Sequence, residues 1–161
     1  MTRITAEPLD GPAGSELVAE LDADLERRYG EGEAVHTDAH EFVAPDGLFL
    51  VLRVDGRPQA CGGYRRIDDT TAELKRMYVR PEVRGTGLAR QLLAGLEEAA
   101  AAAGYEQLWL ETGGSQPEAV ALYESSGYGP IARFGQYAWA PDQRCYGKVL
   151  EPRRSSRTPL S

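Results

Sequence analysis

The most chemically specific stretch of this 161-residue chain is a glycine-rich turn, Arg84-Gly85-Thr86-Gly87-Leu88-Ala89. A strand-like run at residues 74–79 precedes the turn, and a long helix-forming run follows it. A glycine turn that opens a helix presents unpaired backbone N–H groups and the positive end of the helix dipole. The turn therefore predicts a binding site for an anionic group such as a phosphate.

Two common phosphate-binding fingerprints do not fit this turn. No Gly-Lys-Ser/Thr closes it, as a P-loop requires. Gly85 and Gly87 match the first two glycines of the dinucleotide fingerprint, but Arg90 stands where the third belongs. An unrelated nucleotide-binding protein is a disfavoured alternative, since the chain also lacks a magnesium-binding carboxylate after a hydrophobic strand.

Charge is unevenly distributed along the chain, whose net charge is −7. Residues 65–90 carry seven basic and four acidic side chains, a balance that suits a polyanionic cofactor. Residues 1–46 carry twelve acidic side chains and three arginines, which would repel nucleic acid and could favour a cationic substrate. A solvated helix face explains this acidic third equally well. We expect no nucleic-acid partner.

Length and composition indicate one soluble globular domain, with 42% hydrophobic and 27% charged residues. No apolar run approaches the roughly 20 residues that a membrane span requires, and the N-terminus has no secretory signal. Cys61 and Cys145 have no metal-ligand spacing and are expected to be reduced, half-buried thiols. We therefore expect a cytoplasmic protein with no membrane partner.

Hydrophobic periodicity and turn residues predict nine elements and a disordered tail. Ser15 is the expected N-cap of the first helix, which Gly30 stops, and Gly104 and Gly127 end the other two. The expected elements are a strand at 4–6, a helix at 15–30, a hairpin at 48–54 and 59–67, a strand at 71–79, a helix at 87–103, a strand at 108–110, a helix at 118–126 and a strand at 145–150. This order predicts one α/β domain over residues 1–150 around a mixed sheet, followed by a disordered Arg/Ser/Pro-rich tail at 151–161.

The turn and a second motif together resemble the GNAT superfamily of N-acetyltransferases. The turn is similar to the acetyl-CoA pyrophosphate loop of that superfamily, Gln/Arg-x-x-Gly-x-Gly/Ala. Residues 111–128 are similar to its strand–helix pattern, Asn-x-x-Ala-x-x-Leu-Tyr-x-x-x-Gly-Phe/Tyr, and follow at the family's distance. The runs Glu-Thr-Gly, Gln-Pro-Glu-Ala, Leu-Tyr and Phe134-Gly135-x-Tyr137 resemble a bacterial subgroup. The match covers roughly residues 47–150, and Gln116 stands where the superfamily often has Asn.

The resemblance implies a GNAT-like single domain. Its central mixed sheet would be mostly antiparallel, with about six to seven strands, helices on both faces, and a splay between the fourth and fifth strands. It also implies direct transfer of acetyl from acetyl-CoA, as cosubstrate, to a primary amine of a small molecule or protein. A CoA-binding regulatory module without turnover is the alternative. Neither the amine acceptor nor the oligomeric state can be read from the sequence, and a homodimer stays open.

The resemblance assigns the cofactor contacts to two adjoining segments. The pantetheine arm would add like a strand to the backbone of the fourth strand at Met77, Tyr78 and Val79. The pyrophosphate would lie on the glycine turn that follows. The expected contacts on that turn and beyond it are Arg84, Gly85, Thr86, Gly87, Leu88, Ala89 and Gln116.

Transfer also requires that the amine lose a proton, because an ammonium group has no lone pair and amines such as lysine have a pKa near 10. The resemblance implies Glu73 as the carboxylate that accepts this proton. Its alternative reading is an exposed strand residue paired with Lys75. Glu111, at the end of the next strand, is the rival carboxylate, and it could instead bind the substrate's ammonium or hold a loop.

The resemblance implies that Tyr123 donates a proton to the departing CoA sulfur, since a phenol is protonated at neutral pH. The alternative is core packing in a helical apolar stripe with Ala119 and Leu122. His36 and His40 lie in the region that commonly shapes the acceptor pocket of this family. Their four-residue spacing alone is weak evidence for a metal site, and we expect none.

Overall fold

The computed structural model describes residues 1–29, 38–113, 116–135 and 143–151. Tyr137, His36, and the predicted tail from residue 152 onward lie outside these ranges. The sheet strands are β1 (Thr2–Ala6), β2 (Leu48–Val54), β3 (Arg57–Arg66), β4 (Thr71–Val79), β5 (Gln107–Gly113), β6 (Gly129–Pro130) and β7 (Gln143–Val149). The helices are α1 (Pro12–Tyr29), α2 (Leu88–Ala102) and α3 (Pro117–Ser125), with short 3₁₀ helices η1 (Ala39–Phe42) and η2 (Pro81–Val83).

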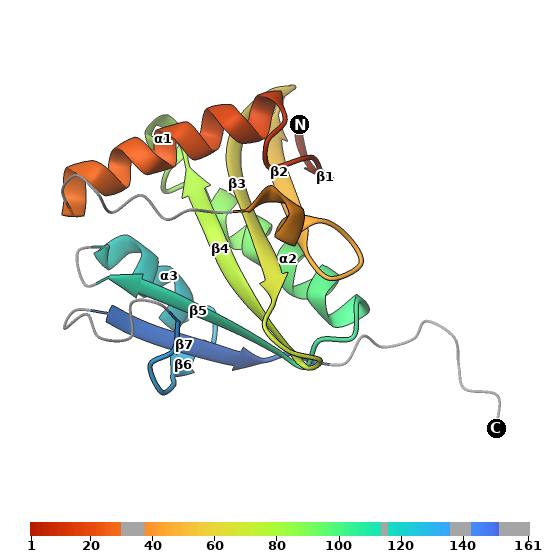
Figure 1. Ribbon diagram of the computed structural model, residues 1–161. Coiled ribbons are helices and arrows are strands. Elements are labelled where there is room, and N and C mark those ends of the chain that lie inside the picture. The colour runs from red at the N-terminus through yellow and green to blue at the C-terminus, as the bar shows by residue number, and fades with distance from the viewer. Residues whose placement is uncertain (30–37, 114–115, 136–142, 152–161) are drawn as a thin grey trace.

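The seven strands form one sheet in the order β1-β2-β3-β4-β5-β7-β6. Every neighbouring pair is antiparallel except β4 and β5, which are parallel. That parallel ladder contains only three residue pairs and stops at Glu73, opposite Trp109, whereas β4 pairs with β3 as far as Val79. The two strands diverge beyond this point, and we call the region where they separate the split (Figure 1). The predicted fold class is confirmed, including the splay between the fourth and fifth strands.

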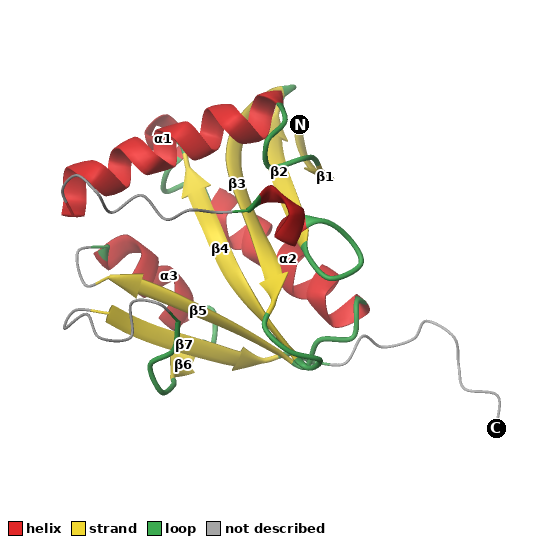
Figure 2. Ribbon diagram, in the orientation of Figure 1, coloured by secondary structure: helices red, strands yellow, loops and turns green. Residues whose placement is uncertain are grey.

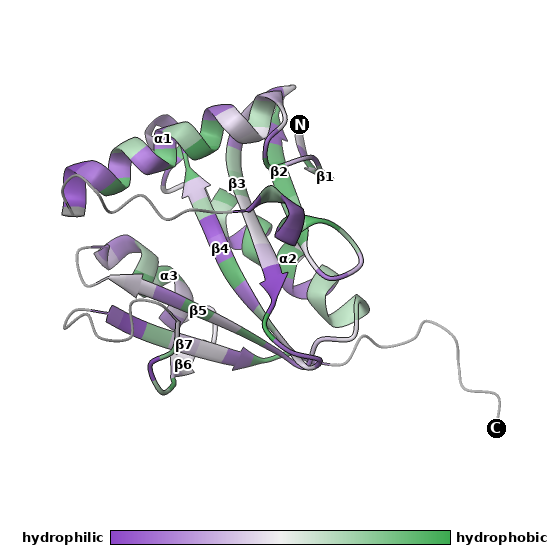
Figure 3. Ribbon diagram, viewed as in Figure 1, coloured by the Kyte–Doolittle hydropathy of each residue, from purple (hydrophilic) through white to green (hydrophobic). Residues whose placement is uncertain are grey.

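Helices cover both faces of the sheet (Figure 2). On one face, Leu17 and Leu21 of α1 pack in a cluster with Phe49, Val51 and Cys61. The other face carries the larger cluster, in which leucines of α2 and the inner side of α3 meet alternate residues of β2, β4 and β5. This arrangement explains the hydrophobic run of β2, which is buried on both faces (Figure 3).

A β-bulge interrupts β4 on its way to the glycine turn. Gly63 pairs with Lys75 and Cys61 pairs with Tyr78, so one residue of β3 lies opposite two of β4. Arg76 is one of these two residues of β4, and its φ of 62° lies in the left-handed region that favours glycine. As a result Tyr78 faces the α1 side of the sheet together with Lys75. Regular alternation would have put these two residues on opposite faces.

Several predicted boundaries need correction. α1 begins at Pro12, three residues before the expected cap, because proline fits the first turn of a helix where its missing N–H costs nothing. The Ser15 N–H therefore donates to the Gly11 carbonyl as an ordinary helical residue. β6, at Gly129–Pro130, was not predicted, since two residues carry no periodicity. η1, at Ala39–Phe42, lies between the first predicted helix and the predicted hairpin and was not among the predicted elements.

Candidate active site

The glycine turn lies where β4 ends and α2 begins, as predicted. Gly85 and Gly87 have φ values of 79° and 86°, which glycine adopts without the steric cost that a side chain adds. Gly87 is the N-cap of α2 and no side chain caps the helix, so the first N–H groups of α2 lack an intrahelical partner. Residues 84–87 are exposed and the space beyond both glycine α-carbons is open. This geometry can receive an anion.

Side chains around the turn hold it in place. Thr86 Oγ1 donates to the Val83 carbonyl at 2.5 Å, and Arg84 Nε donates to the Val79 carbonyl at 2.9 Å. The Arg84 guanidinium also lies 5.8 Å from the centroid of the Tyr78 ring. Leu88 is buried in the core below the turn, so only its backbone faces the anion site. Arg84 is thus folded back over the end of β4.

The predicted pantetheine-binding edge is the part of β4 that β5 does not pair with. Met77, Tyr78 and Val79 lie in this stretch, and their ladder to β3 occupies the other edge. The Tyr78 hydroxyl donates to Glu20 of α1 at 3.2 Å, and its side chain is buried. Only backbone groups of β4 along the split are therefore suited to meet an extended ligand arm.

A cluster of charged side chains lines β4 and β5 at the root of the split. Lys75 Nζ lies 3.7 Å from Glu73 Oε2 and 3.7 Å from Glu111 Oε1, so the two predicted rival carboxylates share one lysine. Glu73 is only 3% exposed. It does pair with Lys75, but the alternative reading of it as an exposed strand residue is wrong.

The outer oxygens of the two carboxylates have different partners. Arg65 Nε donates to Glu73 Oε1 at 3.1 Å, and Arg65 also binds Glu41 of η1. The Gln143 amide of β7 donates to Glu111 and to the Phe134 carbonyl. Glu73 is thus held by a cation, whereas Glu111 is held by a neutral amide.

Burial acts on Glu111 more strongly than its neighbours do. Desolvation raises the pKa of Glu111, while Lys75 and the Gln143 hydrogen bond lower it and the charge of Glu73 raises it again. The net pKa lies above the ordinary value for a glutamate. A carboxylate with this shift binds a proton more readily than an exposed one.

Tyr123 lies on the inner side of α3, on the β5–β7 half of the molecule. It is 6% exposed, and its ring packs edge-on against Tyr128 with the centroids 5.6 Å apart. Burial raises the pKa of its phenol, so the hydroxyl stays protonated well above neutral pH. Core packing and the protonation state needed for a proton donor therefore coexist at this residue.

Gln116 is the N-cap residue of α3, although its side chain does not cap the helix. Two residues later, Glu118 makes a 2.5 Å ion pair with Arg28 in the last turn of α1. The pair joins the helix that covers the first half of the sheet to a helix of the second half, across the open end of the split (Figure 1). Burial raises the pKa of Glu118. Arg28, a backbone hydrogen bond and the charge of Arg84 together lower it by more than burial raises it, so the net pKa is below the ordinary value.

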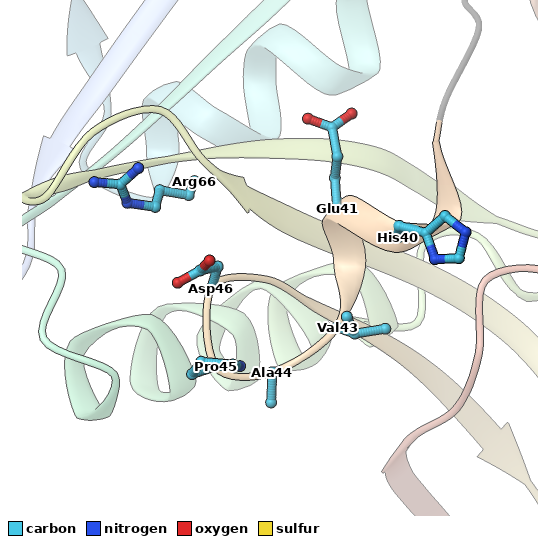
Figure 4. Close-up of a pocket in the computed structure, with 7 residues that line it drawn as sticks. All are labelled: His40, Glu41, Val43, Ala44, Pro45, Asp46 and Arg66. Carbon is cyan, nitrogen blue, oxygen red and sulfur yellow. The ribbon is translucent and has the colours of Figure 1, made fainter.

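A cavity of about 350 Å³ lies away from this cluster, beside η1 and the end of β3 (Figure 4). Its lining residues are His40, Glu41, Val43, Ala44, Pro45, Asp46 and Arg66. Neither the glycine turn nor Glu73, Glu111 or Tyr123 contributes to it. His40 is exposed at this cavity, and no group of three metal-ligating side chains occurs within the ranges that the structure describes.

The sequence analysis missed two residues and one ion pair around this site. Arg65 lies directly opposite Glu73 in the β3–β4 ladder, so a register for this hairpin would have revealed the pair. Nothing in the sequence singles out Gln143. The pairing of Arg28 with Glu118 depends on how α1 and α3 are placed in three dimensions.

Known proteins resemble this chain in both sequence and fold. Residues 15–128 match the sequence pattern of the acetyltransferase (GNAT) family. A protein from Azospirillum brasilense named IAA acetyltransferase is 36% identical over 127 residues, covering 78% of this chain and 83% of its own length. A Klebsiella pneumoniae protein described as an acyl-CoA N-acyltransferase has a solved structure with a TM-score of 0.79 and 29% identity, covering 94% of this chain and 99% of that one.

A GNAT family acetyltransferase from Elizabethkingia anophelis, solved with acetyl-CoA bound, shares the fold with a TM-score of 0.68 at 17% identity. The similarity covers 92% of this chain and 98% of that one. Within the residues described for this protein, no helix is both long and apolar enough to cross a membrane.

Proposed function

Because this chain belongs to the acetyltransferase (GNAT) family, we propose that it transfers the acetyl group of acetyl-CoA directly to a primary amine at the split between β4 and β5. One observation carries the proposal. Glu73 and Lys75, the unpaired edge of β4 and the exposed glycine turn follow one another along a single strand and its exit, and Glu111 of the neighbouring strand β5 lies 3.7 Å from the same lysine. A relative named IAA acetyltransferase supports the reaction class but does not identify the acceptor.

The turn and the strand edge divide the binding of acetyl-CoA between them. The free N–H groups at the start of α2, with Arg84 beside them, suit the pyrophosphate. Backbone groups of residues 77–79 suit the amides of the pantetheine arm, which would add along the edge of β4 as a strand does. When the ligand binds, the Arg84 guanidinium would release the Val79 carbonyl and donate to the ligand instead.

Acetyl transfer forms one bond and breaks one. The amine nitrogen bonds to the acetyl carbon, the thioester C–S bond breaks, and the amine proton passes to a carboxylate. The sequence ranks Glu73 first for this proton, but the environment favours Glu111. Arg65 holds Glu73, which is almost fully buried, whereas Glu111 has a neutral partner and a raised pKa. A base with a raised pKa is better matched to proton transfer near neutral pH.

Tyr123 is proposed as the proton donor to the departing sulfur. Its phenol keeps its proton at neutral pH, because burial raises its pKa. It lies on α3 two turns after Gln116, on the far side of the split from β4. Tyr123 and the favoured acceptor Glu111 of β5 thus both belong to the half of the molecule that faces β4 across the split.

The test of acetyl-CoA binding is a substitution at the turn with a matched control elsewhere. Gly87→Glu places a side chain and a negative charge where the pyrophosphate would lie, so calorimetric titration should detect no acetyl-CoA binding. Gly56→Glu is the control, because Gly56 also has a positive φ of 84° and open space beyond its α-carbon. Both variants should lose a similar amount of stability, about 1–2 kcal/mol from the left-handed backbone.

Only the first variant should lose affinity. Undiminished binding in Gly87→Glu would remove the turn from the cofactor site. Release of CoA thiol in the presence of a panel of amines, with a matching acetylated product, would establish the transfer itself.

A further inference from the structure

The Lys75 side chain is mostly covered, yet it makes no hydrogen bond with any described residue. Its side chain is 11% exposed, and its only recorded partners are two carboxylate oxygens at 3.7 Å. That separation is beyond the 2.7–3.2 Å range of an N–H···O hydrogen bond. An ammonium has three N–H donors, and burying such donors unused is costly. The lysine is therefore a charged group whose donors are available to a ligand.

One of the two acceptors at 3.7 Å, that of Glu111, is also available to a ligand. Glu111 Oε1 faces Lys75 across the 3.7 Å gap, while its other oxygen accepts from Gln143. Gln143 adds a further unused group, since its Oε1 is buried and has no partner among the described residues. A ligand with one acidic and one basic group close together could bind donor and acceptor at once.

The charge balance narrows the class of ligand. Glu73 and Glu111 carry two negative charges, and Lys75 and Arg65 carry two positive ones. The further carboxylate on Arg65, that of Glu41, is 43% exposed, so water screens its charge and the four inner groups are together close to neutral. An added lone ammonium or carboxylate would leave a charge unbalanced in a site with little water, which is unfavourable. A zwitterion keeps the balance. In an α-amino acid the nitrogen and a carboxylate oxygen are roughly 3 Å apart, as standard bond lengths dictate.

We propose that the acceptor is a free α-amino acid, with its carboxylate bound by Lys75 and its amine directed at Glu111. The inference rests on the proposed acetyl transfer and adds the acceptor class to it. Lys75 is then a specificity-determining residue, and Glu73, anchored by Arg65, is the positioning residue that holds the lysine at the split. The product would be an N-acetylamino acid, formed as the amine proton passes to Glu111 and CoA leaves.

The test compares each common L-amino acid with the amino alcohol of the same side chain, which keeps the amine and lacks the carboxylate. For the best amino acid, kcat/KM of the wild type should exceed that of its alcohol on the order of 10–100-fold, mostly through KM. In Lys75→Met this ratio should fall toward one, and in Lys75→Arg, which keeps the charge, most of it should return. Amino alcohols acetylated as well as amino acids by the wild type would overturn the proposal.

A binding measurement separates this inference from the transfer reaction. Calorimetry of the same amino acids and alcohols titrated into the CoA-saturated wild-type protein requires no turnover. Amino acids that bind more tightly than their alcohols without being acetylated would support the recognition and refute the proposed transfer. Acetylation of other amines, with no amino acid bound or acetylated, would keep the transfer and refute the recognition.

Discussion

Glu73 and Glu111 are the same residue type at the same lysine, yet their outer oxygens have different partners. A guanidinium stabilises one, while an amide and burial act on the other. Chemical role at this site is therefore decided by the neighbours of each carboxylate.

This difference makes a prediction about pH. A base must be ionised to accept a proton, so activity falls as pH drops through its pKa. Because the pKa of Glu111 is raised, the acid limb of the kcat/KM profile should lie above the ordinary glutamate value of 4.5. Glu111→Gln should lower the rate at neutral pH about 10²–10⁴-fold and remove that limb. The defect should shrink as pH approaches the pKa of the acceptor amine.

Glu73→Gln is the control for this prediction. It should lower the thermal midpoint, because Arg65 and Lys75 lose a buried negative partner. It should keep the acid limb but move it to lower pH, because the charge of Glu73 raises the pKa of Glu111. The same profile measured for both variants decides the matter. Loss of the limb in Glu73→Gln alone would return the base to Glu73, as the sequence ranked it.

Tyr123 allows a comparison with an adjacent tyrosine. Tyr123→Phe keeps the ring that packs on Tyr128, so acetyl-CoA affinity and stability should change little while kcat falls about 10²–10⁴-fold. Tyr128→Phe is the counterpart, since the Tyr128 hydroxyl donates to Glu97 at 2.8 Å and takes no part in the proposed reaction. That variant should lose stability of about 1 kcal/mol and keep its turnover. Equal kcat values for the two variants would make Tyr123 a core residue.

At the scale of elements, β4 deviates most from a regular strand. Arg76 adopts a left-handed backbone at the bulge, and its guanidinium binds Asp22 of α1 at 2.7 Å. One inserted residue thus rotates the end of the strand and fastens a helix to it.

Because of the bulge, we expect glycine to give a more stable protein than alanine at residue 76, the reverse of the usual order in a strand. Glycine in a strand is ordinarily less stable than alanine by about 0.5–1 kcal/mol. At residue 76 both variants lose the arginine contacts equally and both must adopt the positive φ, which costs alanine about 1–2 kcal/mol and glycine little. Arg76→Gly should therefore unfold at a higher denaturant midpoint than Arg76→Ala. The usual order, with alanine more stable, would show that the strand straightens without the arginine.

Elements with strong periodicity could be predicted from the sequence, and the bulge could not. The leucines of α2 recur at helical spacing and Gly104 follows them, so that helix was predicted almost to the residue. The sequence does not indicate a bulge at Arg76, because the arginine there serves its ion pair with α1 and is not a residue type that favours a positive φ. Motifs allowed the turn and Tyr123 to be predicted as site residues, whereas Arg65 and Gln143 come near the carboxylates only through the register of the strands.

At the scale of the whole molecule, two half-sheets are joined by a ladder of three residue pairs. The Arg28–Glu118 pair connects the helices of the two halves at the open end. Glu118 also acts electrostatically on Arg84, so its negative charge lies near the site proposed for the pyrophosphate.

Removing that charge should help an anion to enter. Glu118→Gln should raise the association rate of acetyl-CoA about 2–5-fold at low salt, with a smaller gain at high salt, because rim charges act mainly on association. Glu98→Gln removes an equal charge from an exposed position on α2 and should have no comparable effect. Stopped-flow measurements at two ionic strengths test this, and identical rates in the two variants would contradict it.

The unpaired edge of β4 also bears on how the protein behaves in storage and in the cell. Free backbone groups on a strand edge can pair with another chain, which is a common route to aggregation. If acetyl-CoA adds along this edge, it occupies the same groups and stabilises the native state by mass action. The cosubstrate would then act as a chemical chaperone. Protein stripped of CoA during purification would aggregate sooner than CoA-loaded protein at the same concentration, and supply of the metabolite would set how long the enzyme survives.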